Sequence, residues 1–147
     1  MGLFDQTVAN QPLEITLTPG QAFASICLIA VAADGVITGN ESQAIITIFS
    51  RMNLFSDISG NNMRDMIDML LNILKAGNAK ALFDKAVVAL PADLKETVFA
   101  ITTDLVLADG ELSEEEETLL DELYNALSIP EALADKIIDV MLIKNKG

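Results

Sequence analysis

The chain contains one short acidic sequence twice, and this repeat limits the folds that it can adopt. The first copy, AADGVITGNE, covers residues 32–41, and the second, LADGELSEEE, covers residues 107–116. In both copies an Asp-Gly pair is followed, at the same spacing, by a branched aliphatic residue, a hydroxyl residue and a glutamate. Because the spacing is identical, we expect each copy to form the same local structure, a turn that leads into a new helix.

The repeat extends beyond these turns. At an offset of 75 residues, the apolar positions 45, 48, 49 and 52 correspond to positions 120, 123, 124 and 127. Further along, MIDMLLNILK (residues 66–75) resembles IIDVMLIKNK (residues 137–146) at an offset of 71. Each copy therefore consists of a helix, a glycine turn, a capped helix and a further helix. Two such units in one core pack most simply around a pseudo-twofold axis.

Apolar residues at helical spacing predict seven helices after residue 18. Their expected ranges are about 19–33, 39–53, 62–76, 79–89, 91–108, 114–127 and 131–143. Three pairs have the spacing of a capping box, in which each residue bonds the backbone N–H of the other: Thr18/Gln21, Thr38/Glu41 and Ser113/Glu116. Since no alternating strand pattern interrupts the series, we predict an all-α fold, a single compact bundle with two pseudo-symmetric halves.

The N-terminal residues differ from the rest of the chain. Residues 1–17 lack the helical period, and Leu13, Ile15 and Leu17 alternate with polar residues. We therefore predict an N-terminal arm over residues 1–17, followed by one helical domain over residues 18–147. A chain of 147 residues is about the size of one ordinary domain.

The charge of the chain restricts its partners. The sequence has 22 acidic and nine basic residues and a formal net charge of −13. Nucleic acids and anionic membranes need a basic surface, so the expected partners are cations or a protein with a basic surface. No apolar run approaches the roughly 20 residues that span a bilayer, and the N-terminus lacks the pattern of a signal peptide. We expect a cytoplasmic protein that does not insert into membranes.

The single cysteine and the absence of histidine restrict the chemistry. Cys27 has apolar neighbours and is predicted to be a buried hydrophobic residue rather than a nucleophile. Without histidine the chain can build neither a histidine-assisted hydrolytic site nor the common Cys/His zinc sites. A metal-dependent hydrolase with paired carboxylates would need a substrate pocket and an activated water, which nothing in the sequence indicates. We predict that the protein is not an enzyme.

The acids of the two turns are the candidate metal ligands. Asp34 and Glu41 match places 5 and 12 of a calcium-binding EF-hand loop, but places 1 and 3 hold alanine or leucine in the two copies. Each turn is therefore half a site at most. If the pseudo-twofold axis brings the turns face to face, four carboxylates supply the oxygen ligands that Ca²⁺, Mg²⁺ or Mn²⁺ prefer, with Zn²⁺ not excluded. These ligands are Asp34, Glu41, Asp109 and Glu116.

A structural interpretation of the same acids stays open. Glu41 and Glu116 occupy the glutamate position of a capping box, and Asp-Gly is a common turn after a helix. The acids then cap helices or pair with a basic partner, and no metal is needed. Asp104, five residues before Asp109, either extends the acidic site or is an ordinary surface charge.

The two ADGxIxxxE-type turns, ADGVITGNE and ADGELSEEE, inside an acidic domain of seven helices resemble the TerB-like family, named for bacterial tellurite resistance. The similarity covers roughly residues 18–146. It implies an all-helical domain with two related halves and a part in tellurite or chemical-stress responses. It also implies an acidic metal-binding site between the halves, at Asp34, Glu41, Asp109 and Glu116.

One difference between the two copies makes the half-sites unequal in charge. Glu114 and Glu115 of the second copy are Gly39 and Asn40 in the first. Tellurite itself is an anion, so a chain with a charge of −13 is poorly suited to bind it directly. The expected function is a non-enzymatic, metal-responsive binding or scaffold module. The alternative is a protein interaction domain that works without metal.

Overall fold

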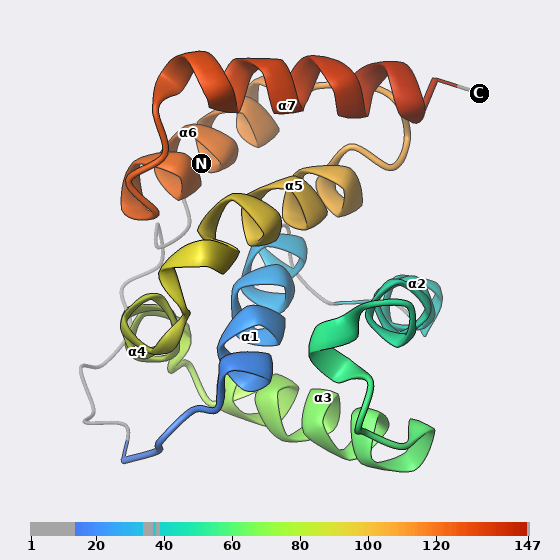
Figure 1. Ribbon diagram of the computed structural model, residues 1–147, viewed down its shortest axis with the longest axis vertical. Coiled ribbons are helices and arrows are strands. Elements are labelled where there is room, and N and C mark those ends of the chain that lie inside the picture. The colour runs from blue at the N-terminus through green and yellow to red at the C-terminus, as the bar shows by residue number, and fades with distance from the viewer. Residues whose placement is uncertain (1–13, 34–36, 38, 147) are drawn as a thin grey trace.

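The computed structural model describes residues 14–33, 37 and 39–146. Within them the chain forms seven α-helices and two short 3-10 helices, without a β-strand (Figure 1). The α-helices are α1 (Pro19–Ala32), α2 (Gly39–Ser50), α3 (Gly60–Lys75), α4 (Ala79–Ala89), α5 (Lys95–Val106), α6 (Glu114–Ala126) and α7 (Glu131–Lys144). The prediction of an all-α fold with seven helices is confirmed for this part of the chain.

The starts of α1 and α6 follow the capping signals in the sequence. Thr18 Oγ1 accepts a hydrogen bond from the Gln21 N–H at 3.1 Å, and Gln21 Oε1 accepts one from the Thr18 N–H at 2.9 Å. Ser113 and Glu116 make the same pair of bonds, at 3.1 and 3.0 Å. These two predicted capping boxes are confirmed. The third begins at Thr38, which lies outside the described residues.

Two helix starts differ from the prediction. The sequence predicts that Pro91 opens the fifth helix, but the 3-10 helix η2 (Ala92–Leu94) comes first and α5 begins only at Lys95. The Leu94 N–H bonds to the Pro91 carbonyl at 2.9 Å, which closes a tight turn before the helix. The third helix begins at Gly60 because Ser59 accepts a hydrogen bond from the Asn62 N–H at 3.2 Å. A second 3-10 helix, η1 (Asn53–Phe55), lies between α2 and α3.

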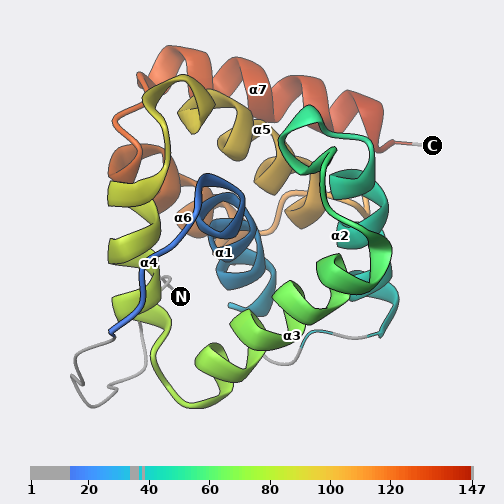
Figure 2. The same ribbon diagram turned by 60° about the horizontal axis from the view of Figure 1, so that its bottom comes forward.

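Helix α1 lies at the centre of the bundle. Every residue from Ala22 to Ala30 is buried, and α1 packs against α3, α4 and α5 (Figure 2). Near its start, Phe23 packs edge-on against Phe49 and Phe55, with ring centroids 6.1 and 6.3 Å away. The apolar run from Ala22 to Ala30 is therefore the core of the domain.

The two halves of the repeat meet at a pair of equivalent residues. Cys27 Sγ lies 3.4 Å from Thr102 Oγ1, and these residues are 75 positions apart, which is the offset of the repeat. Both are fully buried, one on α1 and the other on α5. A residue that contacts its own counterpart lies near the axis that relates the two copies. The predicted pseudo-symmetric halves therefore join where α1 packs against α5.

Residues 14–18, directly ahead of α1, have no regular secondary structure. Of residues 14–18, Leu17 is buried and Ile15 half-buried, whereas Glu14 and Thr16 are exposed. The rest of the predicted arm, residues 1–13, lies outside the described part, and the boundary between arm and domain stays a prediction. Among the described residues, no helix has the length and apolar character to cross a membrane.

Candidate functional site

The four predicted ligands come from the two repeated segments, residues 32–41 and 107–116. Asp34 lies outside the described residues. Glu41 is half-buried in the first turn of α2, and Glu116 is half-buried in the first turn of α6. Asp109 is exposed in the turn between α5 and α6. The structure therefore gives positions for three of the four candidate ligands.

The second turn shows why its Asp-Gly pair is needed. Asp109 Oδ1 accepts a hydrogen bond from the Glu111 N–H at 3.0 Å, and the Gly110 N–H bonds to the Leu107 carbonyl at 2.9 Å. Gly110 has a φ of 79°, in the left-handed region that favours glycine. The aspartate thus satisfies a backbone donor while the glycine reverses the chain. Asp109 therefore has the structural role in a turn that was the alternative to metal binding.

Glu116 also has a local role, because it completes the capping box with Ser113. Glu116 accepts its backbone hydrogen bond through Oε1, and Asp109 accepts its own through Oδ1. A carboxylate has two oxygens, so the second oxygen of each group can bind a cation while the first holds the backbone. Capping and metal binding are therefore compatible roles for these two acids.

The described ranges contain no group of three or more histidine, cysteine, aspartate or glutamate residues that could hold a metal ion. Asp109 and Glu116 form half of the predicted ligand set. A complete site needs the first turn as well, and that turn includes Asp34, which has no described position. The predicted convergence of the four acids stays a prediction.

Both turns nevertheless start from the same junction. Ala33 follows Cys27 by six residues, and Ala108 follows Thr102 by six residues. At 1.5 Å per residue, each turn begins roughly 9 Å along its helix from the contact that joins the halves. The packed core therefore fixes where both acidic turns leave the bundle.

Residues 20–138 match the sequence model of the family described as tellurite resistance protein TerB. The chain belongs to the TerB family. The match includes both acidic turns and runs from the start of α1 to the middle of α7. No curated protein and no solved structure matches the chain.

The cysteine of this TerB domain is not a reactive thiol. Burial raises the pKa of Cys27 to about 12, and the contact with the Thr102 hydroxyl offsets only part of this effect. The thiolate is the nucleophilic form, and at neutral pH almost none is present at such a pKa. The prediction that Cys27 is a buried hydrophobic residue is confirmed.

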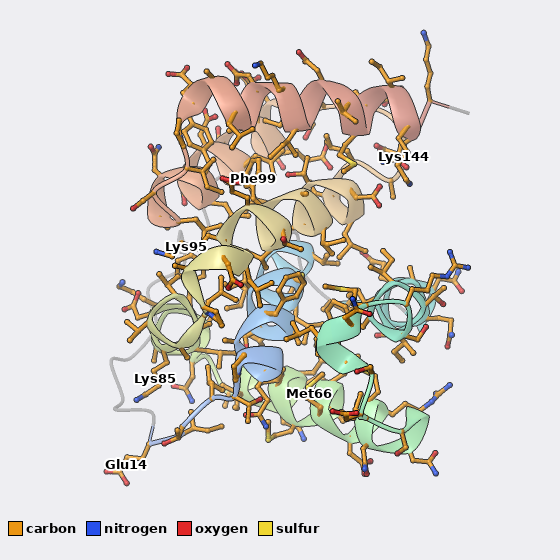
Figure 3. The ribbon with its side chains drawn as sticks, viewed as in Figure 1. Glu14, Met66, Lys85, Lys95, Phe99 and Lys144 are labelled. Carbon is orange, nitrogen blue, oxygen red and sulfur yellow. The ribbon has the colours of Figure 1, made fainter. Side chains whose placement is uncertain are left out.

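The TerB domain has a polar cluster beside the second turn that the sequence does not reveal. Asp104 Oδ1 accepts hydrogen bonds from Asn145 Nδ2 at 2.8 Å and from Lys144 Nζ at 3.2 Å. Figure 3 shows Lys144 at the end of α7, on the side that faces α5. The partners of Asp104 are 40 and 41 residues away in the sequence, so no local spacing could indicate them. Asp104 is therefore not a simple surface charge, because it binds Lys144 and Asn145 at the end of α7.

A shallow, solvent-open depression runs along the outer face of α3. Its lining residues are Asp65, Asp68, Met69, Asn72, Ile73, Ala76 and Asn78. The depression includes no residue of the two acidic turns. It does not enclose a substrate next to the candidate ligands.

Proposed function

We propose that this TerB domain is a non-enzymatic binding module of a tellurite or chemical-stress response, and that it holds a divalent cation at its two acidic turns. The proposed ligands are Asp34, Glu41, Asp109 and Glu116. The observation that carries the proposal is the contact between Cys27 and Thr102, since it joins the two repeats and each turn begins roughly 9 Å along its helix from it. The cytoplasmic location predicted from the sequence belongs to the same proposal.

The chemistry of the proposed ligands favours a hard cation. All four are carboxylates, which suit Ca²⁺, Mg²⁺ or Mn²⁺ better than soft metals, and Zn²⁺ remains a further candidate. A cation also relieves the mutual repulsion of acids in a chain whose net charge is −13. The helical body around the site then serves as the surface on which a partner binds.

The absence of enzymatic activity is part of the proposal. The sequence has no histidine, and the thiol of Cys27 is buried with a pKa of about 12. The depression on α3 lies apart from the acidic turns. Neither a histidine nor an accessible thiolate is therefore available as a general base or nucleophile beside the proposed cation.

A second function is favoured by the hydrogen bonds of the acids themselves. Asp109 and Glu116 each accept a bond from a backbone N–H of their own turn, which accounts for both residue types without a metal. The exposed Glu114, Glu115 and Glu117 of α6 then form a surface for a basic partner. Their place in the first turn of α6 is also favourable for negative charge.

Thermal unfolding of EDTA-stripped protein, with each cation at fixed ionic strength, tests the metal proposal. A cation present at about 100 times its dissociation constant adds roughly 2.7 kcal/mol of stability when it binds only the folded state. We expect a selective rise of Tm that the double variant Asp34→Ala/Asp109→Ala loses. The control Asp65→Ala/Asp68→Ala removes the same charge from the exposed face of α3 and should keep the rise. A rise retained by the folded Asp34→Ala/Asp109→Ala variant would contradict the ligand assignment.

A further inference from the structure

The end of α7 lies directly against the backbone of the second acidic turn. A β-carbon added to Gly110 would be 2.6 Å from the carbonyl oxygen of Asn145 and 3.4 Å from the Cα of Lys146. Real β-carbon contacts to backbone atoms are longer than the first of these distances, so only glycine fits there. The position of the turn therefore depends on the position of Asn145 and Lys146, which directly follow α7.

Asp104 holds this end of α7 in place. Its carboxylate accepts hydrogen bonds from Asn145 and Lys144, and a longer contact of 3.5 Å joins Asn145 Nδ2 to its backbone carbonyl. The Asp104 side chain is only 17 % exposed, whereas that of Lys144 is 58 % exposed. The short bond from Asn145 to a largely buried carboxylate is therefore the better-protected part of this contact.

Electrostatics give Asp104 a reason to bind these partners. It lies in the last turn of α5, where the helix carries partial negative charge and has no basic residue of its own. A carboxylate there is unfavourable until donors approach it. Lys144 and Asn145 supply these donors, and Lys144 also offsets the negative end of α7.

The equivalent positions in the first half of the repeat hold apolar residues, which cannot make this contact. At the offsets of 75 and 71, Asp104, Lys144 and Asn145 correspond to Ile29, Ile73 and Leu74. Ile29 is buried, and Ile73 and Leu74 pack against the hydrophobic core. The polar contact at the second turn therefore does not follow from the repeat, because the three equivalent positions of the first half are apolar.

We propose that Asp104 is a positioning residue for the second acidic turn. Through Asn145 and Lys144 it holds the end of α7 against Gly110, and it thereby fixes the turn that presents Asp109. Since a cation bound at this turn and the docked end of α7 favour the same arrangement, each stabilises the other. This coupling rests on the proposed cation site, whereas the positioning of the turn does not.

Amide hydrogen exchange of the full-length protein in EDTA tests the positioning without any metal. The probes are the amides of Gly110 and Glu111. The internal reference is the amide of Leu107, which directly follows α5 and donates to the Thr103 carbonyl. In Asp104→Ala and Asn145→Ala we expect the two turn amides to exchange about tenfold faster. The Leu107 amide should exchange at the wild-type rate.

Two further variants separate positioning from a general loss of stability. Asp104→Asn keeps an oxygen that accepts from Asn145 and loses the charge, so it should retain most of the protection of the turn. Asp84→Ala removes another carboxylate that pairs with a lysine, Lys80 at 3.2 Å, and should leave the turn unchanged. Wild-type exchange at Gly110 and Glu111 in folded Asn145→Ala would overturn the proposal, and so would equal acceleration of Leu107 in both alanine variants.

Titration of the same variants with Mn²⁺ tests the coupling. We expect Asp104→Ala to bind Mn²⁺ about three- to tenfold more weakly than the wild type, and Asp84→Ala to bind it equally well. Unchanged affinity together with a faster-exchanging turn would overturn the coupling. A wild-type protein that binds no cation would contradict the proposed function, and the exchange in EDTA would still decide whether Asp104 positions the turn.

Discussion

Helices α1 and α5 are equivalent elements of the repeat, but they differ in how many of their residues are buried. In α1 all nine residues from Ala22 to Ala30 are buried, whereas α5 buries only Val98, Phe99, Thr102 and Thr103. The difference coincides with α4, which has no counterpart in the second copy and packs extensively against α1. Packing against α4, which lies between the two copies, therefore contributes to the greater burial of α1.

The outer helices of the two halves show the same difference. Helix α3 buries four residues, whereas α7 buries only Ala134 and Ile138 and leaves Val140 and Ile143 exposed. The end of α7 is instead attached by polar contacts to Asp104. Helix α3 is thus held by apolar packing, whereas the end of α7 is also held by polar groups.

The largest expected effect comes from truncation of equivalent core residues. Phe23 and Val98 occupy the same place in the two copies and are both fully buried. Phe23→Ala should lower the free energy of unfolding by about 3–5 kcal/mol, because it removes a ring packed against two others. Val98→Ala removes two methyl groups and should cost about 2 kcal/mol. Denaturant unfolding measures both, and equal losses would contradict the central role of α1.

A smaller effect is expected from alanine at Gly110 of the second turn and at Gly39, the first residue of α2. Gly110→Ala combines a positive φ with a close backbone contact and should cost about 2–3 kcal/mol. Gly39, at the start of α2, has no atom within 4 Å of an added β-carbon. Gly39→Ala should therefore be neutral or stabilise by about 0.5 kcal/mol. Equal destabilisation by the two changes in urea unfolding would show that the end of α7 does not restrict the second turn.

The burial of the Cys27 thiol makes stability depend on alkaline pH. The pKa of Cys27 is about 12 in the folded protein, against an ordinary value of 9.0. Its unfolded thiol therefore loses a proton first, and stability falls as pH rises from 9 towards 12, by up to about 1.4 kcal/mol per pH unit. Cys27→Ala should remove this part of the dependence of stability on pH. Thr102, the equivalent residue on α5, does not titrate. Parallel stability curves for wild type and Cys27→Ala above pH 9 would contradict the buried, protonated thiol.

The smallest effect on stability separates the capping role of Glu116 from its proposed role as a ligand. Glu116→Gln keeps the capping box, as Gln21 does at the start of α1. In EDTA it should change the free energy of unfolding by less than about 0.5 kcal/mol, yet it should weaken cation binding several-fold because it removes a charge. A Tm rise with cation equal to that of the wild type would assign Glu116 to capping alone.

Local signals in the sequence were enough to predict most of the fold. Capping boxes and helical periodicity act over three or four residues, so Thr18, Ser113 and the helix ranges could be read directly. The delayed start of α5 could not be predicted in this way, because Pro91 suits both a helix start and the 3-10 turn that forms. The contact of Asp104 with Asn145 spans 41 residues and depends on how α5 packs against α7.

The candidate site was predictable only as half-sites. The sequence predicted turns at Asp109 and a cap at Glu116, and the structure contains both. Whether the two turns share one cation depends on the packing of the loops after α1 and α5, which no spacing within either copy encodes. The Cys27–Thr102 contact shows that the halves meet, but a hydrogen-bonded junction in the core does not fix the distance between acids at the surface.

Calorimetric titration of EDTA-stripped protein, with the cation that most raises Tm, tests most directly whether the two turns form one site. A shared site predicts one cation per chain, with binding lost in Asp34→Ala and equally lost in Asp109→Ala. Two cations per chain, with one retained in each single variant, would show that the half-sites work independently. An absence of binding to the wild type with every cation would contradict the metal proposal and favour the acidic turns as caps and as a surface for a basic partner.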